Sequence, residues 1–194
     1  AVRLAGPIFS QRVYEASGDA PVDFPVIAGG FAAAEAEIVF RCAADAPAGK
    51  RDWSLREARE FVGAALLGIE VAGSPLAAIN DLGSTVVVSD FGNNAGLIIG
   101  REIDDWEHRL EGLLCKTVID GETAGEAELA PLAEGALEGL RFLLGHLAAM
   151  GRPLRKGALV STGAITGVHE FHAGQTARCI FGALGELGCR AVSR

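Results

Sequence analysis

AAAEAEIVF, residues 32–40, places two glutamates one residue apart in an otherwise apolar run. If residues 34–40 form a strand, successive side chains point to opposite faces. One face is then apolar, formed by Ala34, Ala36, Ile38 and Phe40. The other carries Glu35 and Glu37, and like charges so close together repel unless a cation lies between them or one is protonated. The stretch therefore predicts either a divalent-cation site or the solvated face of an edge strand.

A third acid strengthens the first of these interpretations. Glu70 lies within the apolar, strand-like stretch 67–72, where an acid has no packing role. Hard cations such as Mg²⁺ prefer oxygen ligands and take several of them. A salt bridge to an arginine elsewhere in the chain would also satisfy Glu70, so both readings stay open.

Composition narrows the class of protein. The chain has 194 residues, 25 acidic and 17 basic, with a net charge of -8. It has no basic cluster of the kind that binds nucleic acid, and no apolar run near the roughly 20 residues that cross a membrane. Its four cysteines have no metal or disulfide spacing. We expect a soluble, cytoplasmic protein that binds neither nucleic acid nor membrane.

The chain reads as a single domain over residues 1–194. Residues 1–30 are rich in Gly and Pro and predict an extended lead-in. The sequence starts at Ala1 and not at a methionine, so the prediction leaves open a further N-terminal segment. A chain of this length buries roughly 70% of its unfolded surface and forms a real core.

The pattern of elements predicts an α+β fold built on a mixed, strongly bent sheet. Capping-box spacing at Ser54–Glu57 predicts a helix over 55–66, and apolar periodicity predicts a longer helix over 129–147. Asp120-Gly121 predicts a hairpin turn. Besides residues 34–40 and 67–72, the expected strands are 85–88, 97–100, 113–119, 158–161, 177–181 and 188–192.

Six segments, in this order, resemble one family. They are Glu35-Ala36-Glu37-Ile38 with Ile69–Ser74, Val88–Asn94, Asp120-Gly121-Glu122, Leu154–Ala164 and Ala173-Gly174-Gln175. From about residue 31 to its end, the chain resembles the 2-keto-4-pentenoate hydratase branch of the fumarylacetoacetase C-terminal-like superfamily. The resemblance implies a bent, barrel-like sheet with a few packed helices.

The resemblance also implies a site. Glu35, Glu37 and Glu70 would bind Mg²⁺ or Mn²⁺, and the ion would chelate the carboxylate and 2-oxo group of a small 2-oxo or 2-hydroxydienoic acid. Thr162, Gly163 and Ser74 would bind the substrate, with Thr162 and the backbone around Gly163 holding its carboxylate. Taken without the family, Ser161-Thr162-Gly163 is an ordinary turn at a strand end.

Two departures from the family pattern concern catalysis. Members carry a lysine and an acid ahead of the first metal-binding glutamates, whereas the lysines here are Lys50, Lys116 and Lys156 and residues 3–7 contain no acid. Residues 75–80 replace a segment that bears Arg and Trp in the family. The catalytic residues are therefore left unassigned.

Three functions follow from these observations. The first is a lyase that hydrates 2-hydroxyalka-2,4-dienoates in the breakdown of aromatic rings. The second is a decarboxylase of 2-oxo dioic acids (4-oxalocrotonate type), and the third is a non-catalytic paralogue that serves as an assembly subunit. We expect a homo-oligomer, or a complex with a related decarboxylase or hydratase subunit.

The other reactive side chains have plainer interpretations. His169 and His172 are three residues apart but not on a helix, so an exposed loop is favoured over a zinc site. Cys42, Cys115 and Cys179 lie in strand-like runs and are interpreted as small core residues.

Overall fold

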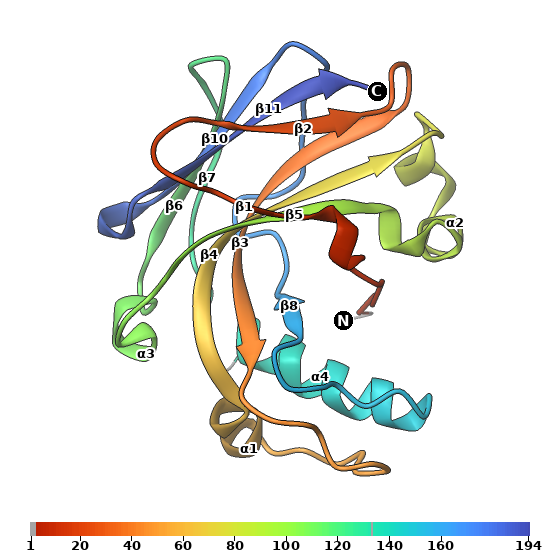
Figure 1. Ribbon diagram of the computed structural model, residues 1–194, viewed down its shortest axis with the longest axis vertical. Coiled ribbons are helices and arrows are strands. Elements are labelled where there is room, and N and C mark those ends of the chain that lie inside the picture. The colour runs from red at the N-terminus through yellow and green to blue at the C-terminus, as the bar shows by residue number, and fades with distance from the viewer. Residues whose placement is uncertain (1–2, 133) are drawn as a thin grey trace.

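The computed structural model describes residues 3–132 and 134–194 (Figure 1). Its strands are β1 (Val13–Glu15), β2 (Val22–Val26), β3 (Phe31–Cys42), β4 (Val62–Ser74), β5 (Asn94–Glu102), β6 (Leu114–Ile119), β7 (Glu122–Glu128), β8 (Leu159–Ser161), β9 (His169–Glu170), β10 (Thr176–Phe181) and β11 (Glu186–Ser193). Its α-helices are α1 (Leu55–Glu60), α2 (Ser84–Ser89), α3 (Trp106–Arg109) and α4 (Ala136–Ala149). Within the described residues, none of these helices is both long and apolar enough to cross a membrane.

The strands form two mixed sheets. The first sheet has the order β1-β5-β4-β3-β8, with β9 also paired to β3, and the second sheet has the order β2-β11-β10-β6-β7. Strands β1 and β5 are parallel, as are β2 and β11, whereas the remaining pairs are antiparallel. The predicted α+β class is confirmed. The strands in the described residues do not close into a barrel, because each sheet keeps its own edges.

The long β3–β4 hairpin is the centre of the first sheet. The two strands pair from Phe31 opposite Ser74 to Arg41 opposite Ala64, and in Figure 1 the hairpin runs toward α1 and α4. The alternation predicted for residues 34–40 is confirmed and extends over the whole of β3. One face of β3, the core face, is formed by residues that share a single buried cluster with the second sheet and α4: Ala32, Ala34, Ala36, Ile38, Phe40 and Cys42.

The two predicted helices form, but both are shorter than expected. Ser54 and Glu57 make the capping box that the sequence predicts. Helix α1 nevertheless ends at Glu60, and β4 begins at Val62, because residues 62–66 gain more from pairing with β3 than from another helical turn. Helix α4 begins at Ala136 and not at residue 129, since the Leu129 N–H donates to the carbonyl of Leu113 and continues the strand region.

The prediction of a strand at residues 85–88 is wrong. These residues form α2, in which the Val87 N–H donates to the Gly83 carbonyl. Val86 and Val87 pack against a small cluster that contains Ile79, whereas Val88 is exposed. The β-branched run therefore buries one side of a helix, because β propensity reflects the available packing surface more than the backbone itself.

The remaining expected strands are confirmed as β5, β6, β8, β10 and β11, although β6 and β8 each begin one residue later than expected. Between β6 and β7, Asp120 and Gly121 have φ values of 49° and 89°. Two consecutive positive φ angles are the signature of a tight hairpin turn whose twist matches the strands. The predicted hairpin at Asp120-Gly121 is therefore confirmed.

Candidate metal centre

The three predicted metal ligands lie on one face of the first sheet, here called the carboxylate face. Glu35 on β3 is directly opposite Glu70 on β4, and Glu37 is opposite Gly68. Residues directly opposite one another in an antiparallel pair project to the same side, with Cβ atoms about 5 Å apart. Pairing of the hairpin thus brings together two acids that are 35 positions apart in the sequence.

Apolar groups flank the three glutamates at both ends of this face. Toward the start of β3, the neighbours form a buried cluster of Phe31, Ala33, Ala72 and Ile79. Toward its end, they form a second cluster of Val39, Ala64, Leu66, Leu97 and Ile99. The acids therefore do not line an open, solvated edge. The alternative that residues 32–40 present the solvated face of an edge strand does not hold for Glu37, whose exposure is only 2%.

The loop that follows β8 holds Glu37 in place. The Gly163 N–H donates to Glu37 Oε2 at 2.8 Å, and the Ser161 hydroxyl donates to the same oxygen. The Gly163 φ of 110° lies in a region that side-chain-bearing residues rarely adopt. Among the described residues both bonds go to Oε2, which leaves Glu37 Oε1 for another partner.

The electrostatics of the site disfavour three ionised carboxylates. Burial, followed by the charge of Glu70, raises the pKa of Glu35 from 4.5 to about 8. The pKa of Glu37 is raised well above its usual value, first by burial and then by Glu70, although the hydrogen bonds from Ser161 and Gly163 oppose the rise. Each charge is costly because water is excluded and the neighbours are like-charged. A cation placed between the carboxylates would remove both costs.

The three glutamate side chains do not form a preorganised metal site. Across residues 3–132 and 134–194, no three His, Cys, Asp or Glu side chains stand in an arrangement that holds a metal ion. Binding of an ion to Glu35, Glu37 and Glu70 would therefore require their side chains to turn toward one another. The donor chemistry fits Mg²⁺ or Mn²⁺, because all three ligands are carboxylates and Glu37 Oε1 is unengaged.

The structure separates the three residues predicted to bind substrate. Gly163 lies against Glu37. The Thr162 hydroxyl donates to the Ile38 carbonyl at 2.8 Å, so it already has a backbone partner. Ser74 shares the carboxylate face but is four residues beyond Glu70, roughly 13 Å along the strand. Its hydroxyl donates to Asp90 Oδ2 at 2.5 Å. Of the three, Gly163 is the one placed beside the acids.

Sequence reasoning missed two polar residues on this face. Ser161 belongs to a sequence typical of an ordinary turn, yet it lies opposite Val39 and its hydroxyl donates to Glu37. Asn94 has no role that its sequence neighbours indicate, yet both polar atoms of its side chain are buried and have no partner among the described residues. The pairing of β8 with β3 could have revealed Ser161, but Ser161 and Glu37 are 124 positions apart in the chain.

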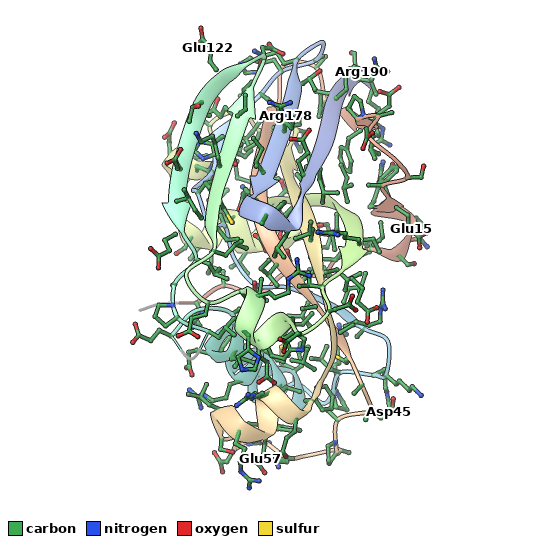
Figure 2. The ribbon with its side chains drawn as sticks, turned by 90° about the vertical axis from the view of Figure 1, so that its left-hand side faces the viewer. Glu15, Asp45, Glu57, Glu122, Arg178 and Arg190 are labelled. Carbon is green, nitrogen blue, oxygen red and sulfur yellow. The ribbon has the colours of Figure 1, made fainter. Side chains whose placement is uncertain are left out.

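A recess in the described part of the chain lies elsewhere. It has a volume of about 360 Å³ and is lined by residues that include Glu15, Arg41 and Glu102, with Glu15 labelled in Figure 2. Arg41 is four residues beyond Glu37 along β3, roughly 13 Å away, and it pairs with Glu102 at 3.2 Å. The recess is thus lined by an ion pair and by residues of β1, β3, β4 and β5, and it does not include the three glutamates.

The two histidines of the sequence 169–172 do not form a metal site together. The His169 ring is half-buried, packs against Gly125 and lies 2.9 Å from the Thr166 carbonyl through Nε2. His172 is exposed. The cysteines Cys42, Cys115 and Cys179 are buried as predicted, and burial raises the pKa of each thiol, which makes them unreactive core residues.

No protein-family model and no curated protein sequence matches the chain. Solved structures do match. For 4-oxalocrotonate decarboxylase from Pseudomonas putida G7, complexed with calcium and acetate, the identity is 21% and the TM-score 0.74 over 94% of this chain and 66% of that one. The same enzyme complexed with magnesium and adipate matches at 20% identity and a TM-score of 0.77, over 94% of this chain and 67% of that one. Fumarylpyruvate hydrolase from Pseudomonas aeruginosa, in complex with Mn²⁺ and pyruvate, matches at 19% identity and a TM-score of 0.64, over 94% of this chain and 74% of that one.

A yeast protein of the fumarylacetoacetate hydrolase family also matches, at 13% identity and a TM-score of 0.66 over 94% of this chain and 82% of that one. Together these matches establish the fold: the chain has the fold of fumarylacetoacetase C-terminal-like proteins, as the motifs predicted. The chain spans about two thirds of the length of the decarboxylase.

Proposed function

We propose that this chain carries the metal-binding core of a divalent-metal-dependent lyase, a hydratase of 2-hydroxyalka-2,4-dienoates in aromatic catabolism. The proposal has two levels. The coarser level is Mg²⁺- or Mn²⁺-dependent chemistry on a small 2-oxo or 2-hydroxydienoic acid. The finer level is addition of water to give a 4-hydroxy-2-oxo acid.

One observation carries the proposal. Glu35, Glu37 and Glu70 share a largely buried face, and none of them is paired with Lys or Arg in the described part of the chain. Buried carboxylates without a counter-charge are strongly unfavourable. The fold adds support, because solved structures with this fold contain calcium, magnesium or Mn²⁺ together with small organic acids.

Each residue of the site has a distinct task in this proposal. Glu35, Glu37 and Glu70 would hold the ion, and Ser161 with the Gly163 N–H would fix the orientation of Glu37, as supporting hydrogen bonds do for metal ligands. When bound, the ion would draw electron density from the 2-oxo group and stabilise an enolate. The apolar clusters on either side would exclude water and strengthen these electrostatic interactions.

The proton-transfer residue lies outside this assignment. Lys50 pairs with Glu57 beside α1, and Lys116 pairs with Glu126 on the second sheet at 2.7 Å. Lys156 is exposed in the loop before β8. None of the three is on the carboxylate face, so the general acid or base of the reaction is not one of these lysines.

A decarboxylase of 2-oxo dioic acids is the second candidate. The likeness to 4-oxalocrotonate decarboxylase favours it, and the same chelated 2-oxo acid head would serve both reactions. A non-catalytic assembly subunit is the third candidate, and the positions of the three lysines favour it. Release of CO₂ measured against loss of the diene chromophore would separate the two reactions, and absence of both would support the subunit.

The first test is a calorimetric titration of the protein with Mn²⁺, with and without oxalate as a mimic of the 2-oxo acid head. We expect micromolar Mn²⁺ affinity that increases when oxalate is present, because oxalate would fill ligand positions left open by the glutamates. No Mn²⁺ binding under either condition would overturn the proposed function.

A further inference from the structure

Asn94, at the start of β5, carries an amide without a hydrogen-bond partner. Its Oδ1 and Nδ2 atoms are both buried, and no described residue contributes a donor or acceptor to either. In the part of the chain that the structure describes, no other side chain has buried polar atoms in this state. Such groups are rare in native proteins and lower stability. An orphaned amide is therefore a reason to look for a ligand.

Strand pairing places this amide on the carboxylate face. Asn94 is directly opposite Ala72, which is two residues from Glu70 along β4 and so projects to the same side. The next residue, Ala95, packs with the core cluster, and a Cβ on Gly73 would lie 2.9 Å from the Ala95 Cβ. A β-bulge shifts the register here, so that Val71 pairs with Gly96 and Ala72 with Asn94. The pairing with Ala72 places Asn94 on the carboxylate face, whereas Ala95 packs on the core side. A diagonal neighbour of Glu70 lies roughly 7–8 Å away.

The surroundings of Asn94 define what it could bind. Between the glutamates and the end of the hairpin, the face is apolar: Phe31, Ala33, Ala72 and Ile79. Farther along β4, Ser74 and Asp90 form a hydrogen-bonded pair at 2.5 Å. A carboxylate at this end of a ligand would meet the like charge of Asp90. A neutral hydroxyl or carbonyl would meet an amide that can both donate and accept.

We propose that Asn94 is a specificity-determining residue that hydrogen-bonds a neutral oxygen in the tail of a 2-oxo acid whose head lies at Glu35, Glu37 and Glu70. The inference rests on the proposed function and deepens it. Asn94 would favour binding of monocarboxylic 2-oxo acids that have a hydroxyl or carbonyl in the tail over binding of dicarboxylic 2-oxo acids. Rejection of a ligand that lacks the tail oxygen follows, because the buried amide would stay unpaired.

The test compares the parent protein with Asn94→Leu, which removes the amide and keeps most of the volume. Oxalate, 4-hydroxy-2-oxopentanoate and 2-oxoadipate are titrated calorimetrically into Mn²⁺-loaded protein. We expect the parent to prefer 4-hydroxy-2-oxopentanoate to 2-oxoadipate. Asn94→Leu should lower the affinity for 4-hydroxy-2-oxopentanoate about 10-fold, the usual effect of one lost hydrogen bond. The affinity of the variant for oxalate should stay within about twofold of that of the parent.

A second readout needs no ligand. Because Asn94→Leu removes an unpaired buried amide, the melting temperature of metal-free protein should rise by roughly 2–4 °C. Asn94→Ala gives the same comparison if leucine does not fit. Asn80→Ala is the matched control, since Asn80 is exposed and bonded to Asn93 at 3.2 Å, and it should change neither readout.

The outcomes separate this inference from the proposed function. If the parent fails to bind Mn²⁺, both are overturned. If Mn²⁺ and oxalate bind normally but both Asn94 variants keep the parent's affinity for 4-hydroxy-2-oxopentanoate, only the inference is overturned. A fall in melting temperature in both variants would also overturn it, because the amide would then stabilise the fold.

Discussion

Asp23 and Glu186 on the second sheet are paired with arginines, whereas the three central glutamates of the first sheet have no Lys or Arg partner among the described residues. On the second sheet, Arg190 donates to both oxygens of Asp23 at 2.6 and 2.9 Å, and Arg178 lies 3.5 Å from Glu186. Arg178 and Arg190 are labelled in Figure 2, at the end of the molecule away from α1. On the carboxylate face of the first sheet, by contrast, Glu37 is buried and Glu35 and Glu70 are half-buried, next to one another and to apolar clusters.

The comparison separates exposed acids that have a counter-charge from half-buried or buried acids that have none in the described part of the chain. Exposed ion pairs contribute little, about 0–1 kcal/mol each, and tolerate substitution. Buried like charges oppose folding of the metal-free protein. Their presence at the centre of the sheet is explained if a cation completes the site, and the following predictions test that explanation.

The largest effect is expected at Glu37. Glu37→Gln keeps the shape of the side chain but removes its charge, so the Mn²⁺ affinity should fall on the order of 100-fold. Calorimetry measures this directly. Glu122→Gln is the matched control, because Glu122 is an exposed acid on β7, and its Mn²⁺ affinity should equal that of the parent. Equal affinities for Glu37→Gln and the parent would remove Glu37 from the site.

A smaller but still large effect is expected at Gly68, which lies opposite Glu37. A Cβ at this position would lie 2.5 Å from the Val39 Cγ2 atom, so Gly68→Ala must shift the fully buried Val39 side chain and disturb its packing. We expect a loss of about 2 kcal/mol in the free energy of unfolding, measured in urea. Gly139→Ala in α4 is the control. Its Cβ would make an ordinary contact at 3.6 Å, and the helix should keep or slightly gain stability.

The third prediction concerns the pH dependence of the metal-free protein. The pKa of Glu35 is about 8 in the folded state against 4.5 ordinarily, so the folded state binds more protons between these values. The stability from this group is therefore present below pH 4.5 and is lost as the pH rises to about 8, at up to about 1.4 kcal/mol per pH unit. Thermal unfolding from pH 5 to 8 measures the loss.

Glu35→Gln supplies the control for this pH dependence. The amide does not titrate, so the stability of the variant should change less between pH 5 and 8 than that of the parent. Saturating Mn²⁺ should also reduce the dependence in the parent, because the ion favours the ionised carboxylates. A parent whose stability rises over this range would contradict the assigned burial of Glu35.

The smallest effect is expected on the second sheet. Asp23→Asn removes one charge of the pair with Arg190, whose side chains are about half exposed. We expect a loss of less than about 1 kcal/mol in the free energy of unfolding and no change in Mn²⁺ affinity. A larger loss than that of Gly68→Ala would show that the surface pairs, and not the hairpin, dominate stability.

Several local features were predictable because their causes lie within a few residues. The alternation of residues 34–40 gives β3 its two faces, the Ser54–Glu57 pair starts α1, and Asp120-Gly121 turns the chain between β6 and β7. The strand expected at residues 85–88 failed for the opposite reason. Those valines do not pair with a strand; they lie in α2, where Val86 and Val87 pack against the Ile79 cluster and Val88 is exposed.

The acids of the candidate site were identified from their neighbours in the sequence, since a charge in an apolar strand is unusual wherever it occurs. Their mutual arrangement was not. Whether Glu70 lies opposite Glu35, whether Ser161 reaches Glu37 and whether Asn94 finds a partner depend on the register of strands that are far apart in the chain.

Sequence patterns thus established the faces of the strands, the caps and turns, and the three acids, because alternation, capping and turn geometry are local properties. Long-range pairing established the rest. Because of this pairing, α1 ends at Glu60 and β4 begins at Val62, and the Gly163 N–H of the loop after β8 donates to Glu37. The same pairing places Asn94 opposite Ala72, where its amide has no partner among the described residues. Register and burial emerge only when distant segments pack together, and they determine which polar groups have partners.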